Sequence, residues 1–139
     1  MRVLFKIYTI CSTVFAVYTH ISFAEPDHAL VYQLKGSVTK VHATTKQGGH
    51  SVGTGVVIAS DIVATNCHIL TDAVNVSVSK MGESISPVAI STDWTHDICL
   101  LKFQYLNLPA VPTRATSSLR YGEEVFSIGF PGGPPKPQT

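Results

Sequence analysis

The chain contains many short runs of apolar residues separated by Gly, Asn, Asp and Ser. The clearest is 73–79, where Val74, Val76 and Val78 alternate with polar residues. A period of two is typical of a strand with one buried face. Further runs that predict strands lie at 36–44, 52–59, 62–65, 88–91, 98–103 and 125–130. Six or seven short strands, each separated from the next by turn-forming residues, predict an all-β barrel or sandwich.

Helical periodicity is almost absent after residue 24, and the one helix candidate is a single turn near 67–72. The last residues, 134–139, belong to a Pro-rich stretch that cannot continue a sheet and resembles a linker. We therefore expect one β domain at 25–133, followed by a Pro-rich tail or truncated linker at 134–139.

The first 24 residues have a different pattern. Arg2 and Lys6 make a basic start, an apolar stretch follows, and Ser22 and Ala24 place small residues at the −3 and −1 positions of a cleavage site. This pattern predicts a secretory signal peptide at 1–24. The alternative is an uncleaved anchor, which the polar residues of the stretch disfavour because a span needs about 20 mostly apolar residues. We expect a secreted or periplasmic protein without a stable membrane anchor.

Composition and charge narrow the possible partners. The chain has 139 residues, 45% of them hydrophobic, and a formal net charge of +1. It has no basic patch and no interleaving of aromatic and basic residues, so we expect no nucleic-acid partner. Removal of residues 1–24 also removes Cys11 and leaves Cys67 and Cys99. Two cysteines in an exported chain favour a disulfide over a metal site or two free thiols.

Two segments carry candidate chemistry. The first is an apolar strand that ends in Thr65-Asn66-Cys67-His68, and the second places Asp97 directly before the apolar run 98–103. A His at the end of one strand and an Asp at the start of another can face each other. An imidazole that acts as a general base needs its Nδ1–H held by a carboxylate. His68 and Asp97 are therefore a candidate base and its orienting carboxylate.

Three segments share a pattern with a known family. They are Gly53-Thr54-Gly55 with the strands that lead to His68, then 96–102, and then 122–132. Their order and spacing resemble those of the trypsin-like serine proteases, in particular the bacterial, Deg-like branch. The resemblance covers roughly 36–132 and implies a serine endopeptidase that acts on peptide or protein substrates without a cofactor. It also implies that His68 is the general base and that Asp97 orients it.

The fold implied by the resemblance is a pair of antiparallel Greek-key, six-stranded barrels with the active site between them. The first barrel supplies the His and Asp, and the second supplies the Ser and the oxyanion-hole amides. Ser117, Ser118 and Ser127 follow Asp97, but none lies in a Gly-Asp-Ser-Gly-like setting. We therefore expect the first barrel of such a protease, inactive alone, as a fragment of a longer enzyme or a half-length relative. The alternative function is a non-catalytic exported β-barrel that binds a peptide or protein through an exposed apolar patch.

Cys67 and Cys99 flank the candidate pair. In the family fold their positions lie on neighbouring strands, so a disulfide would tie the strand of the base to the strand of the carboxylate; two buried thiols are the alternative. Cys67, His68, His96 and Cys99 form a zinc-ligand set on paper. Adjacent residues on a strand point to opposite faces, so we expect no metal site. We expect His96 itself to be a solvated loop residue.

Overall fold

The computed structural model describes residues 28–130 of the chain. Its helical elements are α1 (His28–Lys35) and two 3-10 turns, η1 (Cys67–Leu70) and η2 (Thr116–Ser118). Its strands are β1 (Val38–Thr45), β2 (His50–Ala59), β3 (Ile62–Thr65), β4 (Ala73–Lys80), β5 (Glu83–Ile85), β6 (Ala89–Asp93) and β7 (Ile98–Lys102). The single helical turn expected near 67–72 is present as η1.

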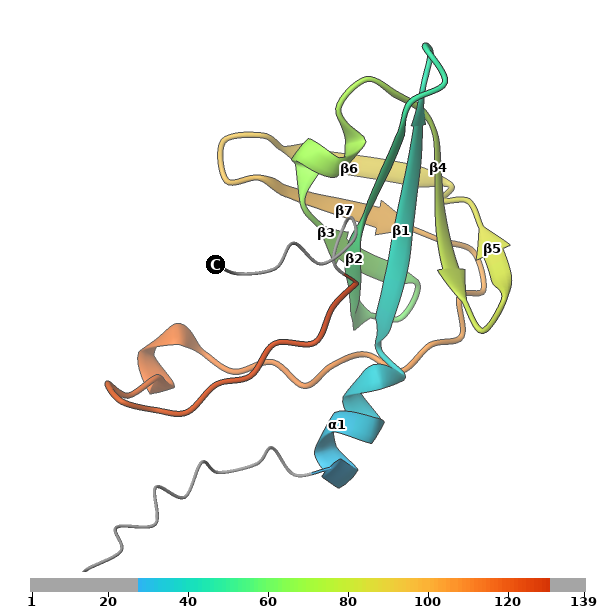
Figure 1. The fold of residues 1–139 in the computed structure, drawn as a ribbon. Coiled ribbons are helices and arrows are strands. Elements are labelled where there is room, and N and C mark those ends of the chain that lie inside the picture. Colours follow the sequence, from blue (N-terminus) through green and yellow to red (C-terminus); the bar gives the residue numbers. More distant parts are fainter. Residues whose placement is uncertain (1–27, 131–139) are drawn as a thin grey trace, which may run out of the picture.

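The seven strands of this region form one antiparallel sheet in the order β5-β4-β1-β2-β3-β7-β6. Within it, β1, β2 and β3 follow one another as hairpins, and β4 returns to lie beside β1. The spatial order 4-1-2-3 is that of a Greek key. The sheet curls on itself into a half-barrel (Figure 1). The predicted all-β Greek-key class is therefore confirmed, with seven strands instead of six because β5 adds a short strand at one edge.

The core lies inside the curl and is made of small branched side chains. The largest fully buried side chains come from β1, β2, β3, β4, β7 and η1: Thr39, Val41, Val57, Val63, Val78, Cys67, Cys99 and Leu101. Gly55 faces this core. A Cβ on Gly55 would lie 2.5 Å from Val63 and 2.6 Å from the Thr39 hydroxyl, so only glycine fits without displacement of its neighbours.

Two sequence predictions are wrong in this region. The first is that the turn near 67–72 is the one helix candidate, because the structure also contains α1. None of the eight residues of α1 is buried. Because the helix packs no face into the core, its sequence carries no strong apolar stripe of the kind that marks a packed helix. Instead the amino group of Lys80, on β4, donates to the carbonyl of Lys35 at the end of α1 and to that of Val38.

The second wrong prediction is the strand at 125–130. The structure has no strand there, although the run is short and mostly apolar. The Val111 N–H still donates to the Val57 carbonyl of β2 at 2.8 Å, and the following residues, 112–130, leave the barrel as an arm that turns back just after η2 (Figure 1). The arm rejoins the barrel only at its end, where the Phe130 N–H donates to the Thr54 hydroxyl at 2.7 Å. A strand needs a neighbour for its backbone groups, and the described part of the chain pairs no strand with 125–130.

The predicted signal peptide at 1–24 and the Pro-rich tail at 134–139 lie outside the described residues. Within residues 28–130, no helix is both long enough and apolar enough to cross a membrane.

Candidate active site

His68 lies on η1, directly after the end of β3. The Thr65 hydroxyl, at that end, donates to the Thr54 carbonyl of β2 at 2.8 Å and ties the end of β3 to β2. The next side chain after His68, Ile69, packs onto Gly53, where a Cβ would lie only 2.0 Å from the Ile69 Cδ1. The glycine-rich β2 strand therefore provides the space in which η1 and its histidine lie close to the sheet.

Asp97 is the last residue of the turn between β6 and β7. Its φ of +55° lies in the left-handed region, which Asp tolerates better than most residues. Its carbonyl oxygen accepts the N–H of Cys67 at 3.3 Å and the side-chain amide of Asn66 at 3.3 Å. The backbone of Asp97 is thus bound directly to the two residues that precede His68.

The carboxylate of Asp97 holds His68 through both of its oxygens. The Nδ1 of His68 lies 2.6 Å from Oδ2, and the backbone N–H of His68 donates to Oδ1 at 2.8 Å. The Asn66 side-chain amide also donates to Oδ2, at 3.1 Å. The geometry thus brings together the two residues proposed from the sequence.

This geometry selects the tautomer of the histidine. An ionised carboxylate only accepts hydrogen bonds, so the proton of a neutral His68 must lie on Nδ1. Nε2 then carries a lone pair, and no described residue is hydrogen-bonded to it. The side chain of His68 is 67% exposed and that of Asp97 is 41% exposed. The lone pair of Nε2 is therefore placed to accept a proton from a group that approaches from outside the barrel.

The same contacts lower the pKa of Asp97. The largest cause is the hydrogen bond from the backbone N–H of His68, followed by the bond from its side chain. Desolvation raises the pKa by less than either of these bonds lowers it, and the charge of a protonated His68 and the bond from Asn66 lower it slightly further. Hydrogen bonds to the ionised form favour it, so Asp97 is held as the acceptor that His68 requires.

Cys67 and Cys99 are joined by a disulfide with an S–S distance of 2.06 Å. Both residues are fully buried. Cys99 pairs with Thr65 in the ladder between β3 and β7, so the bond lies just beneath the two residues of the site. It connects the segment of His68 to the strand that begins directly after Asp97.

A zinc site at Cys67, His68, His96 and Cys99 would require these four side chains to converge. Instead Cys67 bonds to Cys99, His68 to Asp97, and His96 to Asp93. Across residues 28–130, no group of three or more His, Cys, Asp and Glu side chains is arranged to hold a metal ion.

Sequence reasoning missed two polar partners of the site. The sequence pattern gives no separate role to Asn66, although its position directly before Cys67 and His68 lets it reach Asp97. The pattern also gives no role to Asp93, and it predicts that His96 is a solvated loop residue. His96 is indeed exposed, but its ring Nδ1 lies 2.7 Å from the carboxylate of Asp93. The spacing of Asp93, His96 and Asp97 within one turn was the signal available for this pair.

The serines that follow Asp97 do not join the site. Ser117 and Ser118 lie in η2 on the arm, and the Ser118 hydroxyl donates to the Ala115 carbonyl at 2.7 Å. Ser127 lies near the end of the arm. No serine hydroxyl of the described region is hydrogen-bonded to the ring of His68.

The comparison with protein families agrees with this geometry. The family model described as "Trypsin-like peptidase domain" matches residues 53–139, which include both members of the pair. The chain belongs to this family. The expected resemblance to trypsin-like proteases is therefore confirmed.

The relatives found by sequence are named as serine proteases. The chain is 38% identical over 85 residues to the "Probable periplasmic serine endoprotease DegP-like" of Pseudomonas putida (strain GB-1), a match that covers 60% of this chain and 18% of the relative. It is 30% identical over 119 residues to the "Serine protease Rv3671c" of Mycobacterium tuberculosis (strain ATCC 25618 / H37Rv), which covers 81% of this chain and 30% of the relative.

Solved structures agree on the fold. The active form of the Rv3671c protease from M. tuberculosis matches with a TM-score of 0.58 at 30% identity, over 66% of this chain and 43% of that one. The structure described as "HtrA-type protease AlgW with tripeptide" matches with a TM-score of 0.60 at 23% identity, over 68% and 32%. This trypsin-like peptidase chain thus spans less than half the length of the relatives and structures that it matches.

Proposed function

We propose that the chain carries the base-bearing half of a serine endopeptidase active site. The observation that supports this most strongly is the bidentate contact of Asp97 with His68, in which one oxygen accepts Nδ1–H at 2.6 Å and the other accepts the backbone N–H. A bidentate contact fixes both the tautomer and the orientation of the imidazole. These are the two conditions that a general base must satisfy before chemistry begins.

In this proposal a serine outside residues 28–130 provides the nucleophile, from the same protein or from a partner chain. Nε2 of His68 takes the serine proton as Oγ bonds to the peptide carbonyl carbon, and Asp97 stabilises the resulting imidazolium. His68 then gives that proton to the leaving amine as the C–N bond breaks. A water molecule releases the acyl group by the same two proton transfers, with no cofactor. The substrates are peptides or proteins, as the family implies.

We place the protein outside the cytoplasm. One matched relative is named as a periplasmic endoprotease, and residues 1–24 have the basic, apolar and small-residue order of a signal peptide. A disulfide between buried cysteines fits an oxidising compartment.

The test is labelling of the native protein, purified from its source, with a fluorophosphonate probe that reacts with activated serines. We expect labelling at a serine outside residues 28–130, and we expect His68→Ala to abolish it because the serine loses its base. His50→Ala is the matched control, since His50 lies at the exposed start of β2 and its ring is hydrogen-bonded to Thr44, away from the His68–Asp97 pair. Wild-type labelling should survive that change. A folded native protein that takes no label, or a labelled His68→Ala variant, contradicts the proposal.

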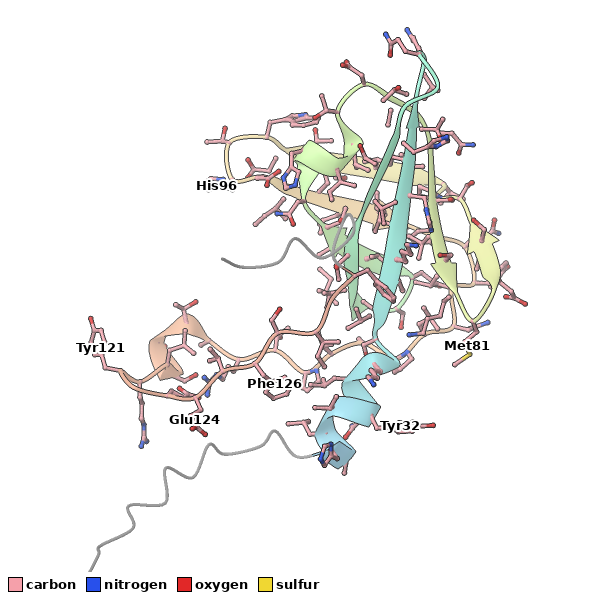
Figure 2. All side chains as sticks on the ribbon, viewed as in Figure 1. Tyr32, Met81, His96, Tyr121, Glu124 and Phe126 are labelled. Carbon is pink, nitrogen blue, oxygen red and sulfur yellow. A yellow bond between two sulfur atoms is a disulfide. The ribbon has the colours of Figure 1, made fainter. Side chains whose placement is uncertain are left out.

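The arm supports a second candidate function, the binding of a protein partner without catalysis. Tyr121 and Val125 are almost fully exposed, and Phe126 and Phe130 are also exposed. Figure 2 shows Tyr121, Glu124 and Phe126 on the part of the arm that extends away from the barrel. Several exposed apolar side chains on one segment are typical of a surface that another protein covers. The labelling experiment separates the two candidates, because a binding protein needs no activated serine.

A further inference from the structure

A second carboxylate lies in the turn that carries Asp97. Asp93 is the last residue of β6, and it pairs across the ladder with Ile98, the first residue of β7. The four residues between them form the turn, and His96 lies on this loop in Figure 2. The Oδ1 of Asp93 accepts the backbone N–H of His96 at 3.1 Å, and its Oδ2 lies 2.7 Å from the His96 Nδ1. The carboxylate of Asp93 therefore binds both the backbone and the side chain of His96.

Such a contact fixes the backbone path of a short turn. Asp side chains commonly accept N–H groups two or three residues later, and the charged form makes the stronger bond. The hydrogen bond from His96 also lowers the pKa of Asp93, so this carboxylate is held in its ionised form. The side chains of Asp93 and His96 are 51% and 71% exposed, so the pair contributes little to the stability of the fold. Its effect is local to the turn.

The residue after His96 is Asp97. Asp97 has a left-handed backbone, and its carbonyl and carboxylate bind three consecutive residues, Asn66, Cys67 and His68. A displacement of the turn by a fraction of an ångström would therefore move the carboxylate oxygens of Asp97 relative to His68. The contact that fixes the N–H of His96 fixes the Thr95–His96 peptide, one peptide unit before the bond that joins His96 to Asp97.

We propose that Asp93 is a positioning residue for the His68–Asp97 pair, acting through the backbone of the turn. It touches neither His68 nor a substrate. Its carboxylate holds the peptide of His96, and this sets the direction in which Asp97 leaves the turn. This inference rests on the proposed function for its effect on catalysis, but its effect on Asp97 can be measured without any activity.

The test measures the pKa of the Asp97 carboxyl by carbon-detected NMR in the 139-residue chain. We expect Asp93→Ala to raise this pKa, because a displaced Asp97 loses hydrogen bonds from His68. Asp93→Asn keeps an oxygen for the His96 N–H, so we expect no rise. Removal of a negative charge near Asp97 would by itself lower the Asp97 pKa, so a rise in Asp93→Ala cannot be a simple charge effect. Glu83→Ala, on β5 at the opposite edge of the sheet, is the charge-matched control.

In the native protein we expect Asp93→Ala to lower kcat on the order of tenfold and to leave KM unchanged, since small misplacements of catalytic groups act on the chemical step. Asp93→Asn should restore most of the lost rate. If Asp93→Ala does not fold, Asp93→Ser replaces it, with a smaller rise in the Asp97 pKa expected from its weaker acceptor.

A folded Asp93→Ala or Asp93→Ser variant with an unchanged Asp97 pKa overturns the inference, and so does an Asp93→Asn variant whose Asp97 pKa rises as much as that of Asp93→Ala. These outcomes are distinct from failure of the proposed function, which appears as a native protein without fluorophosphonate labelling while the NMR result still holds.

Discussion

At the scale of single residues, the site depends on the number of hydrogen bonds that are donated to the carboxylate of Asp97. Asp97 accepts the His68 N–H, the His68 Nδ1–H and the Asn66 amide, although it is partly exposed to solvent. Each donor favours the ionised form of Asp97 over the protonated form. The carboxylate is therefore kept ready to orient the imidazole in a barrel that leaves the pair open to solvent.

The first prediction concerns the acid side of this contact. The folded-state pKa of Asp97 is lowered, so the stabilisation it provides is fully present above the pKa of an unfolded Asp. That stabilisation is lost only as the pH falls through the lower, folded-state value. We expect NMR titration to find Asp97 ionised at a pH where ordinary Asp residues are already protonated.

Asn66→Ala should raise the Asp97 pKa, because it removes one donor to Oδ2. Asn75→Ala is the matched control on β4, where no contact with Asp97 exists. An Asn66→Ala variant that titrates like the wild type would show that the amide does not hold the carboxylate.

At the scale of elements, the disulfide connects the two segments that carry the site. η1 begins at Cys67, one residue before His68, and β7 contains Cys99, two residues after Asp97. The ladder of β3 with β7 already aligns these segments. The disulfide adds a covalent restraint at the end of that ladder, where the strands stop and the catalytic candidates begin.

The disulfide also gives a stability prediction. Cys67 and Cys99 are 32 residues apart, and closure of a loop of that size stabilises the fold by roughly 3–4 kcal/mol on a chain-entropy estimate. We expect the double variant Cys67→Ala with Cys99→Ala to lower the free energy of unfolding in urea by about that amount.

Thiol counting on the unfolded, exported protein is the control for this prediction. We expect Cys67 and Cys99 to contribute no free thiol. Two free thiols, or a double variant as stable as the wild type, would contradict the role assigned to the bond.

The elements also indicate how far the sequence could be interpreted before the structure was known. β4 was predictable because alternation reports a buried face directly, and β7 because a short apolar run is typical of a buried strand. The run at 125–130 is also short and mostly apolar, yet no strand forms there, since such a run does not tell whether a neighbouring strand is available. The helix α1 was missed for the opposite reason, because a helix without buried residues leaves no periodic pattern.

Some parts of the candidate site could likewise be predicted from the sequence, and others could not. His68 and Asp97 could be proposed from the segments around them, because a His at a strand end and an Asp at a strand start are positions that a fold can bring together. The contacts of Asn66 and Asp93 could not be proposed in this way. They depend on the path of two turns and on the left-handed backbone of Asp97, which the one-dimensional pattern does not encode.

At the scale of the whole molecule, the Greek-key sheet brings together groups that are 29 residues apart in sequence. β3 and β7 are neighbours in the sheet although three other strands separate them along the chain. The His–Asp pair is therefore a product of the topology, and the described barrel holds it without any contribution from a nucleophile. We expect the pair to be formed in the 139-residue chain itself.

The tautomer of His68 tests this claim most directly. We would measure the ¹⁵N chemical shifts of its ring in the 139-residue chain, at a pH where the imidazole is neutral. The account predicts a proton on Nδ1 and a bare Nε2, with Asp97→Asn reversing the two because an amide can donate to Nδ1. A neutral His68 with its proton on Nε2, or a tautomer that Asp97→Asn does not change, would contradict the assignment of His68 as the base that Asp97 orients.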